Sequence, residues 1–216
     1  MLTMKKLIVA FCLLIATLGT NAQGLQLGLK ANPIISFLQP ETEGVTNNGA
    51  KLGFSYGLMI DGYFSDNYAL ATEFSIASMS GKMSQVNGTG KDNLVYRLQY
   101  LEIPVALRLT ASPMGKVSFY GLFGLGSGIR LKARGDKDQV DQQGVVSEVY
   151  KDKDLSESIG VFRAALNMGA GVKYSLGGNT AAQIGVTYSN GLNDINTTDE
   201  IKVKISYVSI NLGIFF

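Results

Sequence analysis

Histidine and tryptophan are absent from this chain of 216 residues, cysteine occurs once, at position 12, and proline occurs four times. Without an imidazole, the chain cannot form a Ser-His-Asp or Cys-His catalytic site, and ordinary zinc or haem ligation is also excluded. We therefore expect a protein that is not an enzyme, with no catalytic residue, no cofactor and no metal site.

After residue 22 the chain has no apolar run long enough for a membrane-spanning helix and no sustained helical periodicity. Before it, Lys5 and Lys6 precede an apolar run at 7–18, and small residues follow up to Ala22. This order is typical of a secretory signal peptide, and the run is short of the roughly 20 residues that a retained membrane anchor needs. We expect residues 1–22 to be removed together with Cys12, which leaves residues 23–216 as a domain without disulfides.

The net charge of the exported part is zero. The whole chain carries 19 basic and 17 acidic residues, and the signal peptide takes Lys5 and Lys6 with it. A neutral chain has no electrostatic attraction for phosphate backbones, so we expect no nucleic-acid partner.

Alternation of apolar and polar residues recurs along the rest of the chain. It is clearest at 162–174, where Phe162, Leu166 and Val172 share one face and Arg163 and Lys173 the other. This period of two residues predicts strands with one apolar face, and 26 glycines fit the turns between them. The expected strands span residues 25–32, 52–64, 68–76, 101–109, 117–129, 162–174, 183–189 and 208–216.

The expected connections alternate in length. Short turns lie at 65–67, 111–116 and 176–179, and long polar loops lie at 35–50, 80–93, 132–157 and 190–203. Short turns on one rim, long loops on the other and an even number of strands are typical of outer-membrane barrels.

A soluble lipocalin-like barrel is the alternative, and it needs an apolar interior. In this chain the polar faces of the strands carry charged residues, and charged residues do not belong against lipid. We therefore expect the polar faces to point into the barrel and the apolar faces to meet lipid. The sequence therefore predicts an all-β, eight-stranded antiparallel up-and-down transmembrane β-barrel in the outer membrane of a Gram-negative bacterium, with periplasmic termini.

Seven charged residues are expected inside this barrel. They are Lys30, Asp61, Glu73, Glu102, Arg108, Arg163 and Lys173. Because an eight-stranded barrel has room for little besides side chains and buried charges persist only in pairs, we expect a charge-paired lumen network. We place Lys30 near Glu73, and Asp61 near Arg108 and Lys173. A narrow ion or proton path is the alternative.

Aromatic residues are expected to form a girdle at the periplasmic boundary of the lipid. The members are Phe64, Tyr68, Phe119, Tyr174 and Phe216. Amphipathic rings are favoured between hydrocarbon and headgroups.

Three details concern the middle of the chain. Pro104 has no N–H for a sheet ladder, so we expect a bulge or disrupted pairing there. The apolar phase also changes near Tyr100, from even positions before it to odd positions after it, and a bulge would explain this change.

In the loop at 132–157, Asp136, Asp138 and Asp141 lack the glycine and glutamate of a calcium-binding EF-hand. We expect a solvated loop, with Arg130, Lys132 and Arg134 pointing inward or into the rim.

The segment Tyr100-Leu101-Glu102-Ile103-Pro104, followed by Arg108, resembles the Y-L-E-I-P signature of the PorT-like outer-membrane β-barrel family of Bacteroidetes. Glycine-rich runs at 123–126 and 169–171 and the Ala22-Gln23 processing site are similar to the same family. The resemblance implies an integral outer-membrane barrel in contact with lipid and lipopolysaccharide. The terminal Phe216 resembles the signal that hands such barrels to the barrel assembly machinery.

The resemblance does not fix one activity. The expected function is structural or an interaction through surface loops, with a protein as a possible partner. A component of a secretion or envelope machine, similar to type IX secretion, is the alternative, and a narrow solute channel is a third class.

Overall fold

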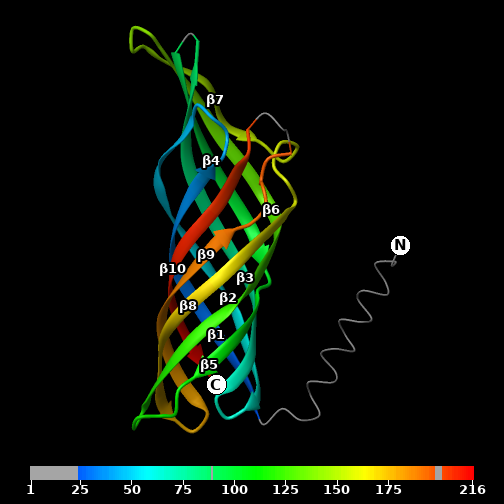
Figure 1. Cartoon of the computed structure of the whole chain (residues 1–216), viewed down its shortest axis with the longest axis vertical. Helices are drawn as coiled ribbons and strands as arrows, with labels where there is room; N and C mark the ends of the chain where they lie inside the picture. Colours follow the sequence, from blue (N-terminus) through cyan, green and yellow to red (C-terminus); the bar gives the residue numbers. More distant parts are fainter. Residues whose placement is uncertain (1–23, 89, 198–200) are drawn as a thin grey trace, which may run out of the picture.

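The computed structural model describes residues 24–88, 90–197 and 201–216, which form one antiparallel sheet closed into a barrel (Figure 1). The predicted signal peptide and Cys12 lie outside these residues. Within the described part of the chain, no helix has the length and apolar character needed to cross a membrane. The strands are β1 (Gly24–Pro40), β2 (Val45–Ser65), β3 (Tyr68–Asn87), β4 (Gly90–Glu102), β5 (Val105–Thr110), β6 (Val117–Asp141), β7 (Val146–Asp154), β8 (Phe162–Gly177), β9 (Thr180–Gly191) and β10 (Val203–Phe215).

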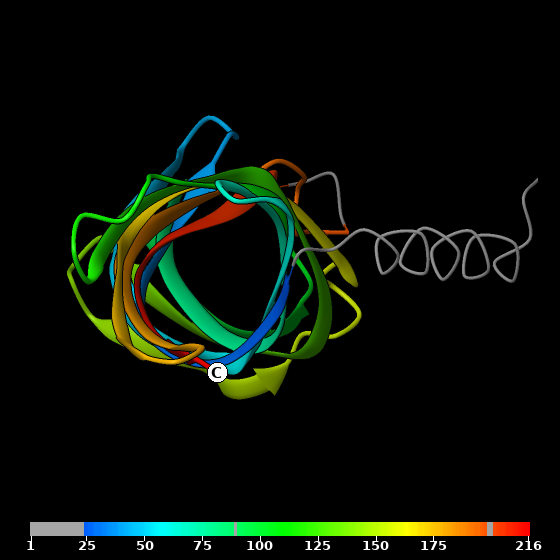
Figure 2. The same cartoon turned by 90° about the horizontal axis from the view of Figure 1, so that it is seen from below.

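The ring has eight positions, although the sheet has ten strands. β4 and β5 share one position, because both pair with β3 on one side and with β6 on the other. β7 stands outside the ring and pairs with the upper part of β6. β10 pairs with β1 and closes the barrel, as the view along its axis shows (Figure 2). The predicted eight-stranded antiparallel barrel is confirmed.

The break between β4 and β5 lies at Ile103 and Pro104, where the sequence predicts disrupted pairing. The carbonyl of Pro104 accepts a hydrogen bond from the Thr72 hydroxyl (2.8 Å) instead of continuing the ladder. This prediction is confirmed.

The lower end of the barrel, at the bottom of Figure 1, holds the C-terminal Phe216 and the short turns at 66–67, 111–116 and 178–179. From this end upward, exposed apolar side chains cover the outside of the barrel, and we call this surface the apolar band. Its members include Leu27, Leu29, Phe54, Leu58, Phe74, Leu107, Phe123, Leu125, Met168, Ile184, Val186, Leu212 and Ile214.

Above the apolar band the two faces of the wall exchange their character. On β3, Phe74 faces outward in the band, whereas Ser80 and Lys82 face outward above it and Met79 and Met83 are buried inside. We call this part the upper extension (residues 36–51, 78–88, 90–99, 132–161, 192–197 and 201–206). Its apolar core consists of Leu38, Val45, Met79, Met83, Leu94, Tyr96, Leu98, Ala133, Leu155, Ile159, Ile195, Val203 and Ile205, together with Ile34, Ala77, Tyr100 and Tyr207 at its lower border.

The prediction of four long loops is largely wrong. Residues 41–44 alone connect β1 to β2, β4 begins at Gly90 soon after β3 ends at Asn87, and β6 continues to Asp141 before β7 begins at Val146. The widest separation between consecutive strands lies between the end of β9 at Gly191 and the start of β10 at Val203. The reason is the exchange of faces. In the upper extension the polar residues of each strand face water on the outside, and a prediction that expects apolar residues on the outside interprets these segments as loops.

The expected bulge as the cause of the phase change near Tyr100 is also wrong. Leu94, Leu98 and Tyr100 keep one regular phase and simply face inward, into the core of the upper extension. A bulge does occur beside Tyr100, but its extra residue is Leu131 on β6. Because of this extra residue, Lys132 and Arg134 face outward rather than inward or into the rim, whereas Arg130, which pairs with Tyr100 before the bulge, donates a hydrogen bond to the Ile159 carbonyl.

Candidate functional site

The seven predicted lumen charges lie inside the barrel, below the core of the upper extension. Their side chains are nearly inaccessible to solvent, except that Glu73 is 21% exposed. The structure brings them together in three groups of opposite charge. The groups are Asp61 with Arg108 and Lys173, Lys30 with Glu73, and Glu102 with Arg163.

In the lowest group, Lys173 donates three hydrogen bonds. Its Nζ lies 3.0 Å from Asp61 Oδ2, 3.0 Å from Gln26 Oε1 and 2.9 Å from the Tyr63 hydroxyl. The same ammonium lies 3.9 Å from the centre of the Phe215 ring. All donors of this buried cation are therefore used, and the ring face adds a cation–π contact.

Arg108 is the second cation on the same carboxylate, with Nε 3.1 Å from Asp61 Oδ2. Its Nη1 donates to Gln183 Oε1 (2.9 Å), and the guanidinium stacks 4.5 Å above the Tyr120 ring. Tyr120 fits against β8 and β9 because glycines lie there, since a Cβ at 171 or 185 would come within 2.6 or 2.4 Å of its hydroxyl. One aspartate thus serves two cations, and aromatic faces share the surplus positive charge.

The uppermost group is an ion pair with complete hydrogen bonding. Arg163 is 1% exposed, and its Nη1 donates to Glu102 Oε1 (2.8 Å). Its Nη2 donates to Ser189 Oγ (3.0 Å) and to the Ile205 carbonyl (3.1 Å). The other oxygen of Glu102 accepts a hydrogen bond from the Tyr207 hydroxyl (2.6 Å). A buried pair satisfied in this way holds β4, β8 and β10 in one arrangement.

Between these groups, Lys30 forms an ion pair with Glu73. A cavity of about 40 Å³ lies beside this pair, lined also by Arg108 and Tyr120, which is enough for about one water molecule. Glu73 and Glu102 are each held by a cation rather than by each other, so they do not form an acid–base pair. Among the described residues, no group of three or more metal-binding side chains is arranged to hold an ion.

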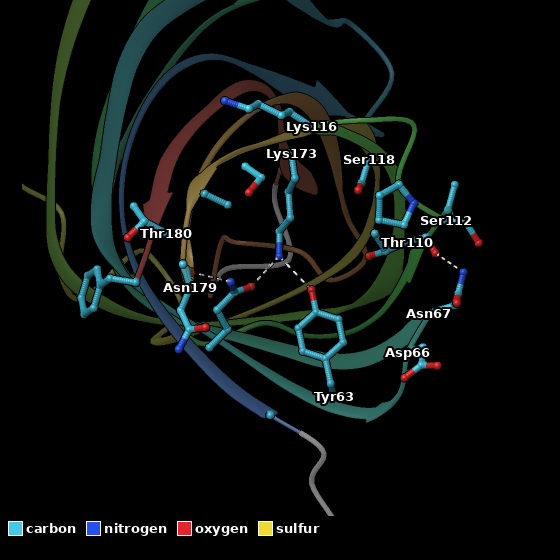
Figure 3. A pocket seen from close by; sticks show the side chains of 18 of the residues that line it. Tyr63, Asp66, Asn67, Thr110, Ser112, Lys116, Ser118, Lys173, Asn179 and Thr180 are labelled. Carbon is cyan, nitrogen blue, oxygen red and sulfur yellow. Dashed lines mark hydrogen bonds between the residues drawn. The ribbon is translucent and has the colours of Figure 1, made fainter.

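A second, larger cavity of about 880 Å³ opens at the lower end (Figure 3). Lys173 and Tyr63 lie at its base, while Asp66, Lys116 and Asn179 belong to the surrounding turns (Figure 3). The lining is a mixture of hydroxyl, amide and charged groups. This cavity was not predicted, because the turns that form it are separated along the chain and carry no motif.

The five predicted girdle aromatics lie on the outside near the lower end and are between 43% and 57% exposed. The rings of Phe64 and Tyr68, at the two sides of the turn between β2 and β3, stack with centroids 6.2 Å apart. They stand below the apolar band, where a lipid boundary would lie.

On the outside of the upper extension, Arg97 links β4 to the β6–β7 hairpin (residues 132–154). Its Nη2 donates to Asp136 Oδ1 (2.7 Å) and to Asp152 Oδ1 (3.2 Å), and Arg134 binds the other oxygen of Asp152. The Asp152 amide donates to Asp136 Oδ1 (2.7 Å). The hydrogen bond from Arg97 lowers the pKa of Asp136 to about 2. These aspartates are therefore committed to arginines.

This pairing predicts an acid-sensitive hairpin. Because the pKa of Asp136 is lowered on folding, the stabilisation is fully present above the ordinary value of 3.8 and is lost as the pH falls toward 2. Pepsin should cleave the β6–β7 hairpin of Asp136→Asn roughly two- to fivefold faster than that of the wild type at pH 4, since exposed pairs contribute little. The two rates should converge near pH 2. A rate ratio that stays constant over this interval would contradict the assignment.

Comparison with known families decides the class of this barrel. The description "Outer membrane protein beta-barrel domain" belongs to a family whose sequence pattern matches residues 21–195. The chain belongs to this family. It is an outer-membrane barrel, so the apolar band faces lipid and the protein sits in an environment of lipid and lipopolysaccharide.

The chain is similar to solved structures of other outer-membrane barrels, at low sequence identity. Neisserial surface protein A is 15% identical with a TM-score of 0.47, and the match covers 89% of this chain and 96% of that one. For Ail of Yersinia pestis the values are 14%, 0.37, 89% and 97%, and for OprG of Pseudomonas aeruginosa 11%, 0.41, 88% and 94%. No curated protein matches the chain significantly.

The upper extension of this outer-membrane barrel and its apolar core were not predicted from the sequence. A signal was present: Leu94, Tyr96 and Leu98 alternate with Val95, Arg97 and Gln99 as regularly as any predicted strand. The alternation has the polar face outward, which is the pattern of a strand in water.

Proposed function

We propose that this outer-membrane barrel is a non-conducting anchor that holds a folded β-structure outside the membrane for contacts with another macromolecule. The exchange of inner and outer character above the apolar band carries this proposal. A wall that is apolar inside and polar outside is built for water, so the upper extension stands clear of the lipid.

The filled interior supports the non-conducting part. Arg108 and Arg163 are 1% exposed, and Tyr100, Met79 and Ile205 above them are fully buried. A solute would have to pass both the charge-paired lumen and an apolar core. This structural role of the lumen charges accounts for their pairing without an ion path, and transport remains the weakest of the three classes. With no histidine in the chain and both lumen glutamates paired with cations, we also propose that the protein is not an enzyme.

The β6–β7 hairpin supports the contact role. β7 pairs with β6 on one side, and Val145, Val146 and Val149 are exposed. An edge strand can add a strand from a partner, whose backbone completes the ladder while its side chains meet the exposed valines.

The orientation proposed here keeps the termini and girdle at the periplasmic side, and the upper extension at the cell surface of a Gram-negative bacterium. The support is the girdle at the lower end, together with the predicted signal peptide at 1–22. We keep the PorT-like, Bacteroidetes assignment and delivery to the barrel assembly machinery through Phe216 as parts of the proposal, based on the Y-L-E-I-P segment and the terminal aromatic.

A component of a secretion or envelope machine is the second candidate. The lower cavity of about 880 Å³ favours it, because it gives the periplasmic turns a concave surface for a partner. In this case the contacts would involve residues 111–116 rather than β7.

Single cysteines would test the orientation, since the expected loss of Cys12 leaves no other thiol. A membrane-impermeant maleimide should label Val149→Cys on intact cells and should label Ser112→Cys, at the lower turn, only after the envelope is opened. Photo-crosslinking residues at the same two positions should give a discrete product at 149 and none at 112.

The reverse labelling pattern would overturn the proposed orientation. A crosslinked product at 112 alone would favour the secretion machine. The purified protein in planar bilayers should show no conductance steps, and regular steps would contradict the filled lumen.

A further inference from the structure

Cations gather on the outside of the barrel directly above the apolar band, on the four neighbouring strands β2, β3, β4 and β6. We call them the basic patch, which consists of Lys51, Lys82, Arg97, Lys132 and Arg134. Their position at the upper border of the lipid-facing surface raises the question of what they meet there.

The strand register places these side chains side by side. Ser80 on β3 pairs with Arg97 on β4, which pairs with Arg134 on β6, and Gln99 pairs with Lys132 in the adjacent row. Lys82 follows Ser80 by two residues on the same outward face. Cross-strand neighbours on one face lie about 5 Å apart at their Cβ atoms, so the cations of three strands share one surface.

Lys51 joins the patch from β2. It lies at an irregularity of the β2–β3 pairing between Ala50 and Phe54, where a bulge can redirect a side chain. The ammonium of Lys82 comes close enough to lower the pKa of Lys51, and Arg97 adds to this effect. Two like charges at this separation repel each other, and an anion between them would turn the repulsion into attraction.

The patch has a surplus of positive charge. Arg97 and Arg134 bind Asp136 and Asp152, as described above. For Lys51, Lys82 and Lys132, the described residues provide no carboxylate within ion-pair distance. Three ammonium groups are thus available to an external anion.

Their height matches the headgroup layer. Lys51 directly precedes Leu52, which is 80% exposed, and Lys132 directly follows Leu131, which is 52% exposed. Above these leucines, none of the described large apolar side chains on β2 or β6 is exposed. Since the polar headgroups of a bilayer begin where its hydrocarbon ends, the lysines reach the layer that contains lipid phosphates.

We propose that the basic patch binds the phosphate groups of a bisphosphorylated glycolipid of the outer leaflet, a lipid of the lipid A class, through Lys51, Lys82 and Lys132. The proposal rests on the surface orientation of the upper extension proposed above. The acyl chains of such a lipid would lie against the apolar band near Phe54 while its phosphates meet the ammonium groups. Ser78 and Ser80 offer hydroxyl donors between them.

Native mass spectrometry of the full chain folded in detergent would test this site, with bisphosphorylated lipid A as the probe. Each lysine near a charged lipid surface contributes on the order of a fivefold gain in affinity. The variant Lys51→Gln/Lys82→Gln/Lys132→Gln should therefore bind lipid A about 100-fold more weakly than the wild type. Lipid A that lacks one phosphate should bind the wild type more weakly than bisphosphorylated lipid A does. The ratio of its affinities for the wild type and the triple variant should also be smaller.

The matched control is Lys91→Gln/Lys116→Gln/Lys202→Gln, which removes the same charge from exposed positions outside the basic patch. It should bind lipid A within about threefold of the wild type. Equal losses in both triple variants would show a net-charge effect and overturn the site, as would unchanged binding by the patch variant. Equal affinity for inorganic pyrophosphate would overturn the lipid as its ligand.

Two measurements keep folding and orientation separate from binding. Faster migration of unboiled protein on a gel shows whether each variant forms a closed barrel, and the single changes Lys51→Gln and Lys132→Gln, at about fivefold each, replace the triple variant if it does not fold. Reversed thiol labelling of Val149→Cys with intact lipid A binding would contradict the orientation alone. Normal labelling with lost discrimination between the triple variants would contradict the lipid site alone.

Discussion

Replacement of Asp61 by alanine is expected to destabilise the barrel by about 3–5 kcal/mol, because removal of one partner of a buried ion pair leaves its counter-charge unpaired. Asp61 is the carboxylate shared by Arg108 and Lys173, and all three side chains are at most 8% exposed. The variant would leave two buried cations close to each other. Urea unfolding in lipid vesicles, followed by gel mobility and circular dichroism, would measure the loss.

The control is Asp66→Ala, five residues along the chain in an exposed turn, which should change stability by less than about 0.5 kcal/mol. A second test uses the cation. Lys173→Met should cost less in the Asp61→Ala background than in the wild type, because it removes an already unpaired charge. Additive effects of the two changes, or a loss below 1 kcal/mol for Asp61→Ala, would mean that the lumen network does not stabilise the fold.

A charge in the core of the upper extension should open that region and leave the membrane-spanning wall intact. Leu98 on β4 is 2% exposed and packs in the core of the upper extension. Leu98→Asp would bury a carboxylate without a partner, which costs several kcal/mol. We expect cleavage of the β6–β7 hairpin by trypsin to increase at least 100-fold, with unchanged mobility of the lower barrel on an unboiled gel.

Gln99→Asp places the same charge one residue away on the outer face, beside Lys132 and Ser78. Trypsin should cleave the β6–β7 hairpin of this variant at the wild-type rate. If Leu98→Asp also abolished the mobility difference, the upper extension and the membrane-spanning wall would be a single cooperative unit. If both variants were cleaved at the wild-type rate, the upper extension would not depend on its apolar core.

The sequence determines the membrane-spanning half of the fold well. In residues 162–174 and 208–216, each apolar residue on one parity faces lipid and each polar or small residue on the other faces the lumen. This works because lipid and lumen impose opposite demands on adjacent residues. The same reason predicts the inward position of Lys30, Asp61 and Glu102, each of which pairs inside the barrel with a residue of opposite charge.

The upper extension could not be predicted in the same way, because alternation does not say which face is inside. Leu98 and Leu101 lie three residues apart on one ring position, yet Leu98 faces the core and Leu101 the lipid. The solvent changes from lipid to water between them, and one-dimensional periodicity contains no information about that change. The basic patch escaped prediction because its five residues come from four strands and depend on register, including the extra residue at Leu131.

The pairing of β1 with β10 has a consequence for how the barrel assembles. The closing contact between Leu212 and Asn32 joins residues 180 positions apart in the chain, so the first strand has no lasting neighbour on that side until the last one has been made. Such distant pairings incur a large loop-closure entropy and fold slowly. During this interval β1 presents an open edge and an apolar face to water, so the nascent chain is exposed to aggregation and depends on an escort that keeps it unfolded until its final strand arrives.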